Sequence, residues 1–85
     1  MKFQITIKHE RKSIRLSVQL TEQNEANEKY MVTAKNQSFL LQNNRPVIKA
    51  RGLKYFPITW KVIQGGYSYK SLLDQITKAI EEKIR

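Results

Sequence analysis

Apolar and polar residues alternate in two neighbouring segments near the start of the chain. In residues 3–7, Phe and Ile alternate with Gln and Thr, and in residues 14–20 Ile, Leu and Val alternate with Arg, Ser and Gln. A period of two is typical of a strand that buries one face. The two segments are joined by a polar break at residues 9–12. They therefore predict a β-hairpin with one apolar and one solvated face.

The middle of the chain predicts further strands separated by polar turns. Residues 21–28, TEQNEANE, are expected to form a loop with room for one helical turn. Asn and Pro at residues 43–46 indicate another turn, because Asn tolerates a left-handed backbone and Pro cannot donate to a ladder. The expected strands of this region are residues 30–35, 38–42 and 58–62, with a short edge strand at residues 47–49.

The end of the chain has the pattern of a helix. Leu72, Ile76 and Ile80 recur every four residues, which gives an apolar stripe wide enough to cover one sheet face. We therefore expect an α+β fold with two layers, in which an antiparallel sheet of four to five strands carries one C-terminal helix on one face. With 85 residues, the chain is expected to form a single domain over residues 1–85.

The chain is strongly basic, and its charges are unevenly distributed. Sixteen Lys and Arg residues face seven Asp and Glu residues, which gives a net charge of +9. No acid occurs in the window from Lys29 to Leu73, although the window holds eight cations. Such a window produces a positive potential that attracts polyanions, such as nucleic acid, an anionic membrane surface or an acidic protein.

The composition excludes several chemistries. The chain has no cysteine, which rules out disulfides, thiolate metal sites and thiol catalysis. With a single histidine, His9, no zinc site is expected. His9 and Glu10 are adjacent and suited to acid–base chemistry, but a solvated turn is the favoured interpretation, so an enzyme is not expected. We also expect no cofactor and no small-molecule ligand. Because the alternating N-terminus lacks a long apolar run, we expect no membrane span and a cytoplasmic location.

Residues 45–61 are the strongest candidate for a binding surface. Cations are interleaved here with Tyr55 and Phe56, in a segment bounded by a Gly and a Pro that favour irregular backbone. This mixture suits a surface that contacts phosphates and stacks on bases. Trp60 is expected to lie in the core instead, because Trp supplies a large buried area to a small domain. The candidate binding residues are Arg45, Lys49, Arg51, Lys54, Tyr55 and Lys61.

The solvated face of the sheet is a second candidate. Charged and amide side chains on an open sheet face could follow a phosphate backbone. A plain solvated face, whose charges prevent aggregation, is at least as strong an interpretation. The outer-face residues would be Lys2, Gln4, Thr6, Lys8, Arg15, Ser17, Gln19, Thr59 and Lys61.

These patterns leave three hypotheses for the function. The first is a small basic, non-enzymatic binding module that contacts nucleic acid, DNA or RNA, mainly through phosphates. The alternative is a protein-interaction or oligomerisation module that uses the aromatic and cationic segment 45–61, with an acidic protein as a partner. The third is a small basic ribonuclease, which would depend on His9 and Glu10 as base and acid.

The stretch LQNNRPVIKARGLKYFPITWKVIQGG, residues 41–66, resembles a family of small uncharacterised bacterial proteins. The similarity lies in a Leu-Gln-Asn-x-Arg-Pro element at residues 41–46 and a Trp-Lys-Val-Ile element at residues 60–63. It spans about a third of the chain. The resemblance implies a bacterial source, but that family has no assigned activity, so no site is transferred from it.

Overall fold

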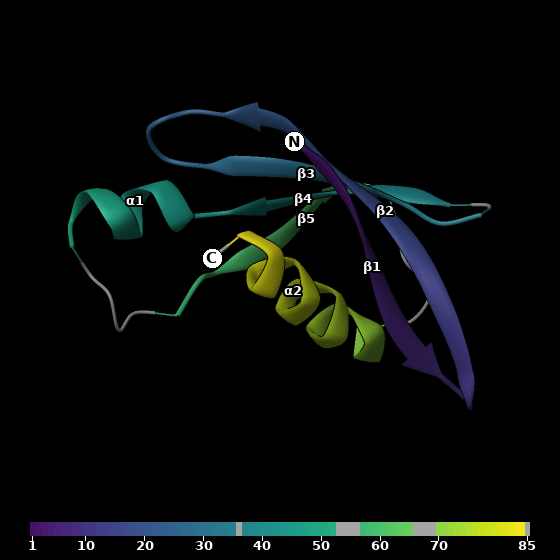
Figure 1. The fold of residues 1–85 in the computed structure, drawn as a ribbon. Helices are drawn as coiled ribbons and strands as arrows, with labels where there is room; N and C mark the ends of the chain where they lie inside the picture. The colour runs from purple at the N-terminus through teal and green to yellow at the C-terminus, as the bar shows by residue number, and fades with distance from the viewer. Residues whose placement is uncertain (36, 53–56, 66–69, 85) are drawn as a thin grey trace.

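A computed structural model describes residues 1–35, 37–52, 57–65 and 70–84. Its elements are β1 (Lys2–His9), β2 (Lys12–Gln23), β3 (Glu28–Thr33), β4 (Ser38–Asn43), α1 (Arg45–Ala50), β5 (Trp60–Gln64) and α2 (Lys70–Ile84). The strands form one antiparallel sheet in the order β1-β2-β3-β4-β5, and α2 lies across one face (Figure 1). This two-layer arrangement confirms the predicted fold class. No helix in the described ranges is long and apolar enough to cross a membrane.

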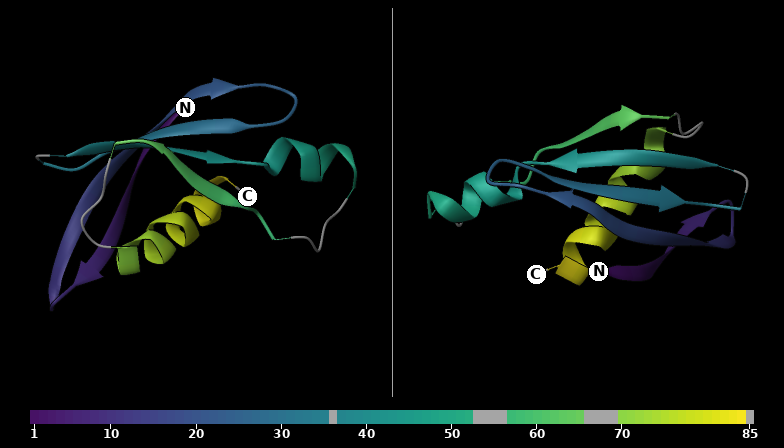
Figure 2. Two further views of the ribbon diagram at one scale, coloured as in Figure 1. Left: turned by 180° about the vertical axis from the view of Figure 1, so that it is seen from behind. Right: turned by 90° about the horizontal axis from the view of Figure 1, so that it is seen from above.

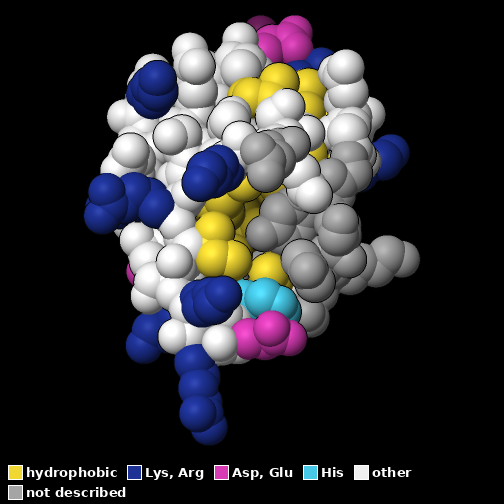
Figure 3. All heavy atoms as spheres, turned by 90° about the vertical axis from the view of Figure 1, so that its right-hand side faces the viewer, with side chains coloured by type: hydrophobic (Ala, Val, Ile, Leu, Met, Phe, Trp, Pro, Cys, Tyr) yellow, Lys and Arg dark blue, Asp and Glu magenta, His cyan; other side chains and the backbone are white. Residues whose placement is uncertain are grey.

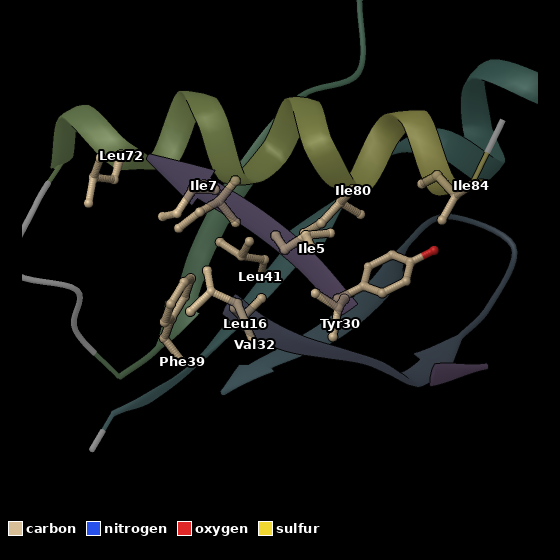
Figure 4. Close-up of a cluster of buried hydrophobic side chains, with 12 residues drawn as sticks. Ile5, Ile7, Leu16, Tyr30, Val32, Phe39, Leu41, Leu72, Ile80 and Ile84 are labelled. Carbon is tan, nitrogen blue, oxygen red and sulfur yellow. The ribbon is translucent and has the colours of Figure 1, made fainter. Parts of the chain in front are cut away.

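The core lies between the inner face of the sheet and α2. Alternate residues of the strands point inward, as predicted, and meet the apolar stripe of the helix (Figure 4). The buried core residues are Ile5, Ile7, Leu16, Val18, Tyr30, Val32, Phe39, Leu41, Leu72, Ile76, Ile80 and Ile84. Each fully buried aliphatic side chain contributes roughly 1.5–3 kcal/mol by leaving water. This single core fixes which sheet face remains open to solvent.

The hairpin between β2 and β3 is longer than the sequence pattern indicates. The predicted loop at residues 21–28 is wrong, because only residues 24–27 form the turn and the rest belongs to the two strands. A register shift after Leu20 keeps the polar end of β2 paired with β3. The Oδ1 atom of Asn24 accepts hydrogen bonds from two backbone N–H groups of the turn, both at 2.8 Å.

Residues 47–49 belong to α1, so the predicted edge strand is wrong. Pro46 stands in the first turn of this helix, where its fixed φ is suitable and its missing N–H is not needed. The carbonyl of Asn44 accepts hydrogen bonds from the N–H groups of Val47 and Ile48 at 3.1 and 3.2 Å. The β-branched side chains of Val47 and Ile48 favour a strand, but Pro46 and the hydrogen bonds to Asn44 start a helix here.

The last strand, β5, begins two residues later than predicted, at Trp60, and ends just before Gly65. Gly65 has a φ of 80°, and a Cβ atom there would lie 2.7 Å from the carbonyl oxygen of Ser38 on β4. A side chain at this position would therefore clash with β4, and glycine permits the close approach.

The β1–β2 hairpin extends beyond the rest of the sheet. β1 pairs with β2 over its whole length, but β2 pairs with β3 only from Ser17 onward. Residues 5–16 therefore form a two-stranded ribbon, which we call the distal ribbon. It bends out of the plane of the other strands toward the α2 side and ends at one end of the molecule, whereas α1 lies at the other (Figures 1 and 2).

Candidate polyanion-binding surface

Arg45, the first candidate residue, is engaged by the protein itself. Its Nη1 atom lies 3.0 Å from Oε2 of Glu28, and its Nη2 atom donates to the backbone carbonyl of Ile84. The Arg45 and Glu28 side chains are only 16% and 3% exposed, so this charge-assisted pair is shielded from water. Arg45 thereby ties α1 to β3 and to the end of α2. The arrangement gives Arg45 a structural role, and the contact of Arg45 with a phosphate stays a prediction.

Tyr30 is buried in the same region. Its hydroxyl points toward the end of α2 that carries Ile84 (Figure 4). Burial, and then the negative charge of Glu28, raise the pKa of Tyr30 to about 12. The hydroxyl therefore stays neutral near the ion pair until the solution is strongly alkaline.

Acids from the β2–β3 hairpin lie close to cations of the window 29–73. Oε2 of Glu22 lies 2.8 Å from Nζ of Lys29. Glu25 lines the same surface hollow as Arg51. Together with the buried ion pair described above, these contacts bring acids against a window that is free of acids in the sequence. Its positive potential is therefore weaker than the sequence alone suggests.

The other candidate residues are dispersed. Lys49 and Arg51 are exposed at the end of α1, and Lys61 is exposed on β5, where it lies opposite a residue of β4. Lys54 and Tyr55 lie outside the described residues. Among the predicted residues that the structure describes, only Lys49 and Arg51 are exposed neighbours, at the end of α1.

The β1–β2 hairpin carries a dense group of exposed cations, which we call the hairpin cations: Lys2, Lys8, Arg11, Lys12 and Arg15. In the part of the chain that the structure describes, none of these side chains forms an ion pair. The one acid among residues 2–15, Glu10, lies 3.8 Å from Nε2 of His9. Figure 3 shows Lys and Arg side chains grouped on the side of the molecule that displays the histidine.

The strand register places four of the hairpin cations close together near the turn, whereas Lys2 lies opposite Gln19 at the other end of the two strands. Lys8 lies opposite Ser13, and Arg15 lies opposite Thr6 one step along the same face. Lys8 and Arg15 are therefore diagonal neighbours on the outer face. Arg11 occupies the turn, and Lys12 follows it. Like charges held this close, with one acid among residues 2–15, favour the binding of a polyanion.

A simple count along the chain would have identified the hairpin. Residues 2–15 contain five cations and one acid, whereas the window 29–73 spreads eight cations over 45 residues. The alternation of β1 and β2 predicts three of the hairpin cations, Lys2, Lys8 and Arg15, on the outer face. Residues 45–61 are the stronger candidate in the sequence because that segment has no acid and contains aromatic residues.

A groove lies between the edge strand β5 and α2. Its lining includes the half-buried side chains of Trp60, Val62 and Leu73. The indole Nε1 of Trp60 donates to Oε1 of Glu81 at 2.8 Å, and its ring lies 6.0 Å from that of Tyr30. Trp60 therefore packs against the core, as predicted, and joins β5 to α2.

Among the described residues, no group of three or more His, Asp and Glu side chains is placed to hold a metal ion. Comparisons with protein-family models, with curated proteins and with solved structures found no match.

Proposed function

We propose that this protein is a small non-enzymatic module that binds nucleic acid mainly through phosphates. The observation that carries the proposal is the group of hairpin cations, which are exposed and unpaired within the described residues. Four of them, Lys8, Arg11, Lys12 and Arg15, belong to the distal ribbon, whose tip lies at one end of the molecule (Figure 2). The net charge of +9 adds a long-range attraction for any polyanion.

Neutral donors on the outer face support a phosphate contact. Side chains with hydroxyl or amide groups stand between the cations, and such groups make a large share of the hydrogen bonds to phosphates and sugars in nucleic-acid complexes. These residues are Gln4, Thr6, Ser13, Ser17 and Gln19. Cations with neutral donors between them can hold a backbone without reading its sequence.

The salt dependence of binding tests this function. Each phosphate contact releases counterions, so the affinity for a labelled DNA or RNA of about 20 nucleotides should fall steeply as salt rises. The double charge reversal Lys8→Glu with Arg15→Glu should weaken binding about tenfold or more and reduce the salt slope by about 2. Fluorescence anisotropy between low and moderate salt measures both quantities.

A matched control changes the same charge elsewhere. Lys78 and Lys83 are exposed on α2, away from the outer sheet face, so Lys78→Glu with Lys83→Glu should weaken binding much less. Circular dichroism should show that both double variants remain folded. A flat salt response, or no binding to any DNA or RNA at low salt, would remove the proposal.

The alternative, an interaction or oligomerisation module, rests on the edge strand β5 and the groove beside it. A second copy in this groove would bring two chains of net charge +9 together, which disfavours self-association at low salt. We therefore expect a monomer in sedimentation experiments across a wide concentration range. A dimer that forms at low salt would favour the alternative, whereas an acidic protein partner would be attracted by the same charge.

A further inference from the structure

We propose that the distal ribbon lies in the major groove of double-stranded DNA, with its outer face toward the groove and its tip against the phosphates. This inference rests on the proposed function and names its substrate class. Its starting point is the pairing of the strands. Residues 5–9 and 12–16 pair only with each other, because β2 meets β3 from Ser17 onward.

The ribbon has the shape that a groove requires. Two paired strands are about 4.8 Å apart, and the major groove of B-form DNA, about 12 Å wide, admits a two-stranded ribbon. The distal ribbon bends toward the α2 side of the sheet, so its outer face is convex (Figure 1). A convex face can enter a groove without bringing the rest of the sheet into contact with the duplex.

The ribbon is held rigidly from behind. Its inner face contributes Ile5, Ile7 and Leu16 to the core. At its free edge, the backbone N–H of Lys8 donates to Oε1 of Gln75 at 3.1 Å, and Nε2 of Gln75 donates to the carbonyl of Lys8 at 3.1 Å. These contacts fix the ribbon on α2, so little flexibility is lost when it binds.

The tip of the ribbon is narrow and basic. His9 pairs with Lys12, so the loop consists of Glu10 and Arg11 alone, with φ values of 49° and 68°. Positive φ at both positions is typical of the tight two-residue turn that matches the twist of the strands. This turn places Arg11 and Lys12 at the end of the ribbon, where they can reach phosphates at the groove edge.

The outer face favours duplex DNA over other nucleic acids. Its side chains on β1 and β2 are cations, hydroxyls and amides, while Phe3 lies on the inner face against the core. The described residues of this face therefore offer no ring on which an unpaired base can stack, unlike surfaces that bind single strands. The major groove of A-form RNA is deep and narrow, so the ribbon fits it poorly.

The experiment compares one sequence of about 20 nucleotides as duplex DNA, single-stranded DNA and duplex RNA at the same salt. We expect binding to duplex DNA to be about tenfold tighter than to the other two forms. The variant Arg11→Gly with Lys12→Ala should bind duplex DNA with about tenfold lower affinity, and its affinity for the other two forms should change little. Glycine suits the positive φ of the turn, so this loss would not reflect unfolding. Lys78→Ala with Lys83→Ala is the matched control.

Groove occupancy supplies a second readout. Methyl green, which occupies the major groove, should compete with the protein, and netropsin, which occupies the minor groove, should not. Equal affinity for all three nucleic acids, or competition by netropsin alone, would overturn this inference and leave the proposed function standing. Failure to bind any nucleic acid would instead remove the proposed function and the inference together.

Discussion

The guanidinium of Arg45 lies inside the molecule, where its charge stabilises the fold. It is joined to Glu28 and to the last turn of α2 through Ile84. A buried ion pair of this kind is costly to break from one side, because the other charge is left without a partner. At the scale of single residues, burial therefore separates cations that stabilise the fold from cations that can meet a ligand.

Replacing Arg45 tests this structural role. Arg45→Met leaves the Glu28 carboxylate buried and alone, so the free energy of unfolding should fall by about 3 kcal/mol. Urea denaturation measures the change. The double variant Glu28→Gln with Arg45→Met should recover part of the loss, since no unpaired charge remains. An unchanged stability in Arg45→Met, with weaker binding to DNA, would instead assign Arg45 to the binding surface.

The buried hydroxyl of Tyr30 predicts a loss of stability at high pH. Its pKa is about 12 in the folded protein and about 10 in an unfolded chain, so the folded state keeps its proton over a pH range in which the unfolded state loses it. The free energy of unfolding should therefore be unaffected by this group below pH 10 and fall by about 2–3 kcal/mol by pH 12.

The control for this effect is Tyr30→Phe. The informative quantity is the difference between wild type and variant, because it isolates the effect of the tyrosine hydroxyl. Urea denaturation at pH 9 and at pH 11 should show a larger loss in the wild type. An equal loss in both proteins would contradict a raised pKa for this tyrosine.

The turn between β1 and β2 is the most strained element on the described backbone. Glu10 and Arg11 are the described non-glycine residues with positive φ, and such residues cost about 1 kcal/mol or more each. The turn nevertheless keeps a cation at the tip of the ribbon. Strain retained at a charged tip fits a binding role for this element.

Arg11→Gly should raise the free energy of unfolding, because glycine adopts a φ of 68° without strain. The expected gain is about 1 kcal/mol, reduced by the greater freedom of glycine in the unfolded chain. Thermal unfolding followed by circular dichroism is sufficient to measure it. A lower melting temperature than wild type would show that the arginine side chain stabilises the turn.

The sequence was most informative where structure is local. The alternation in residues 3–7 and 14–20 predicted the first hairpin, and the spacing of Leu72, Ile76 and Ile80 predicted the helix and its buried stripe. The prediction failed at residues 47–49, where β-branched side chains resemble a strand but the preceding proline starts a helix. It also failed at residues 21–28, because pairing with a partner strand extends polar segments that have no apolar pattern of their own.

At the scale of the whole molecule, the fold decides which charges remain free. Acids of the β2–β3 hairpin approach cations that lie far from them in the sequence, as the contact between Glu28 and Arg45 shows. No count along the chain reveals such pairs, because they depend on the order and register of the strands. The hairpin cations keep their charge exposed because residues 2–15 contain one acid, Glu10, and Glu22 of β2 is paired with Lys29.

The most direct test of the account compares two double charge reversals, one at each end of the molecule. Lys8→Glu with Arg15→Glu changes the hairpin, and Lys49→Glu with Arg51→Glu changes α1, with the same change in net charge. We predict that the hairpin variant loses about tenfold or more in affinity for a labelled duplex DNA at a fixed moderate salt. The loss of affinity in the α1 variant should be several-fold smaller. Equal losses, or a larger loss for the α1 variant, would contradict the claim that the β1–β2 hairpin carries the nucleic-acid contact.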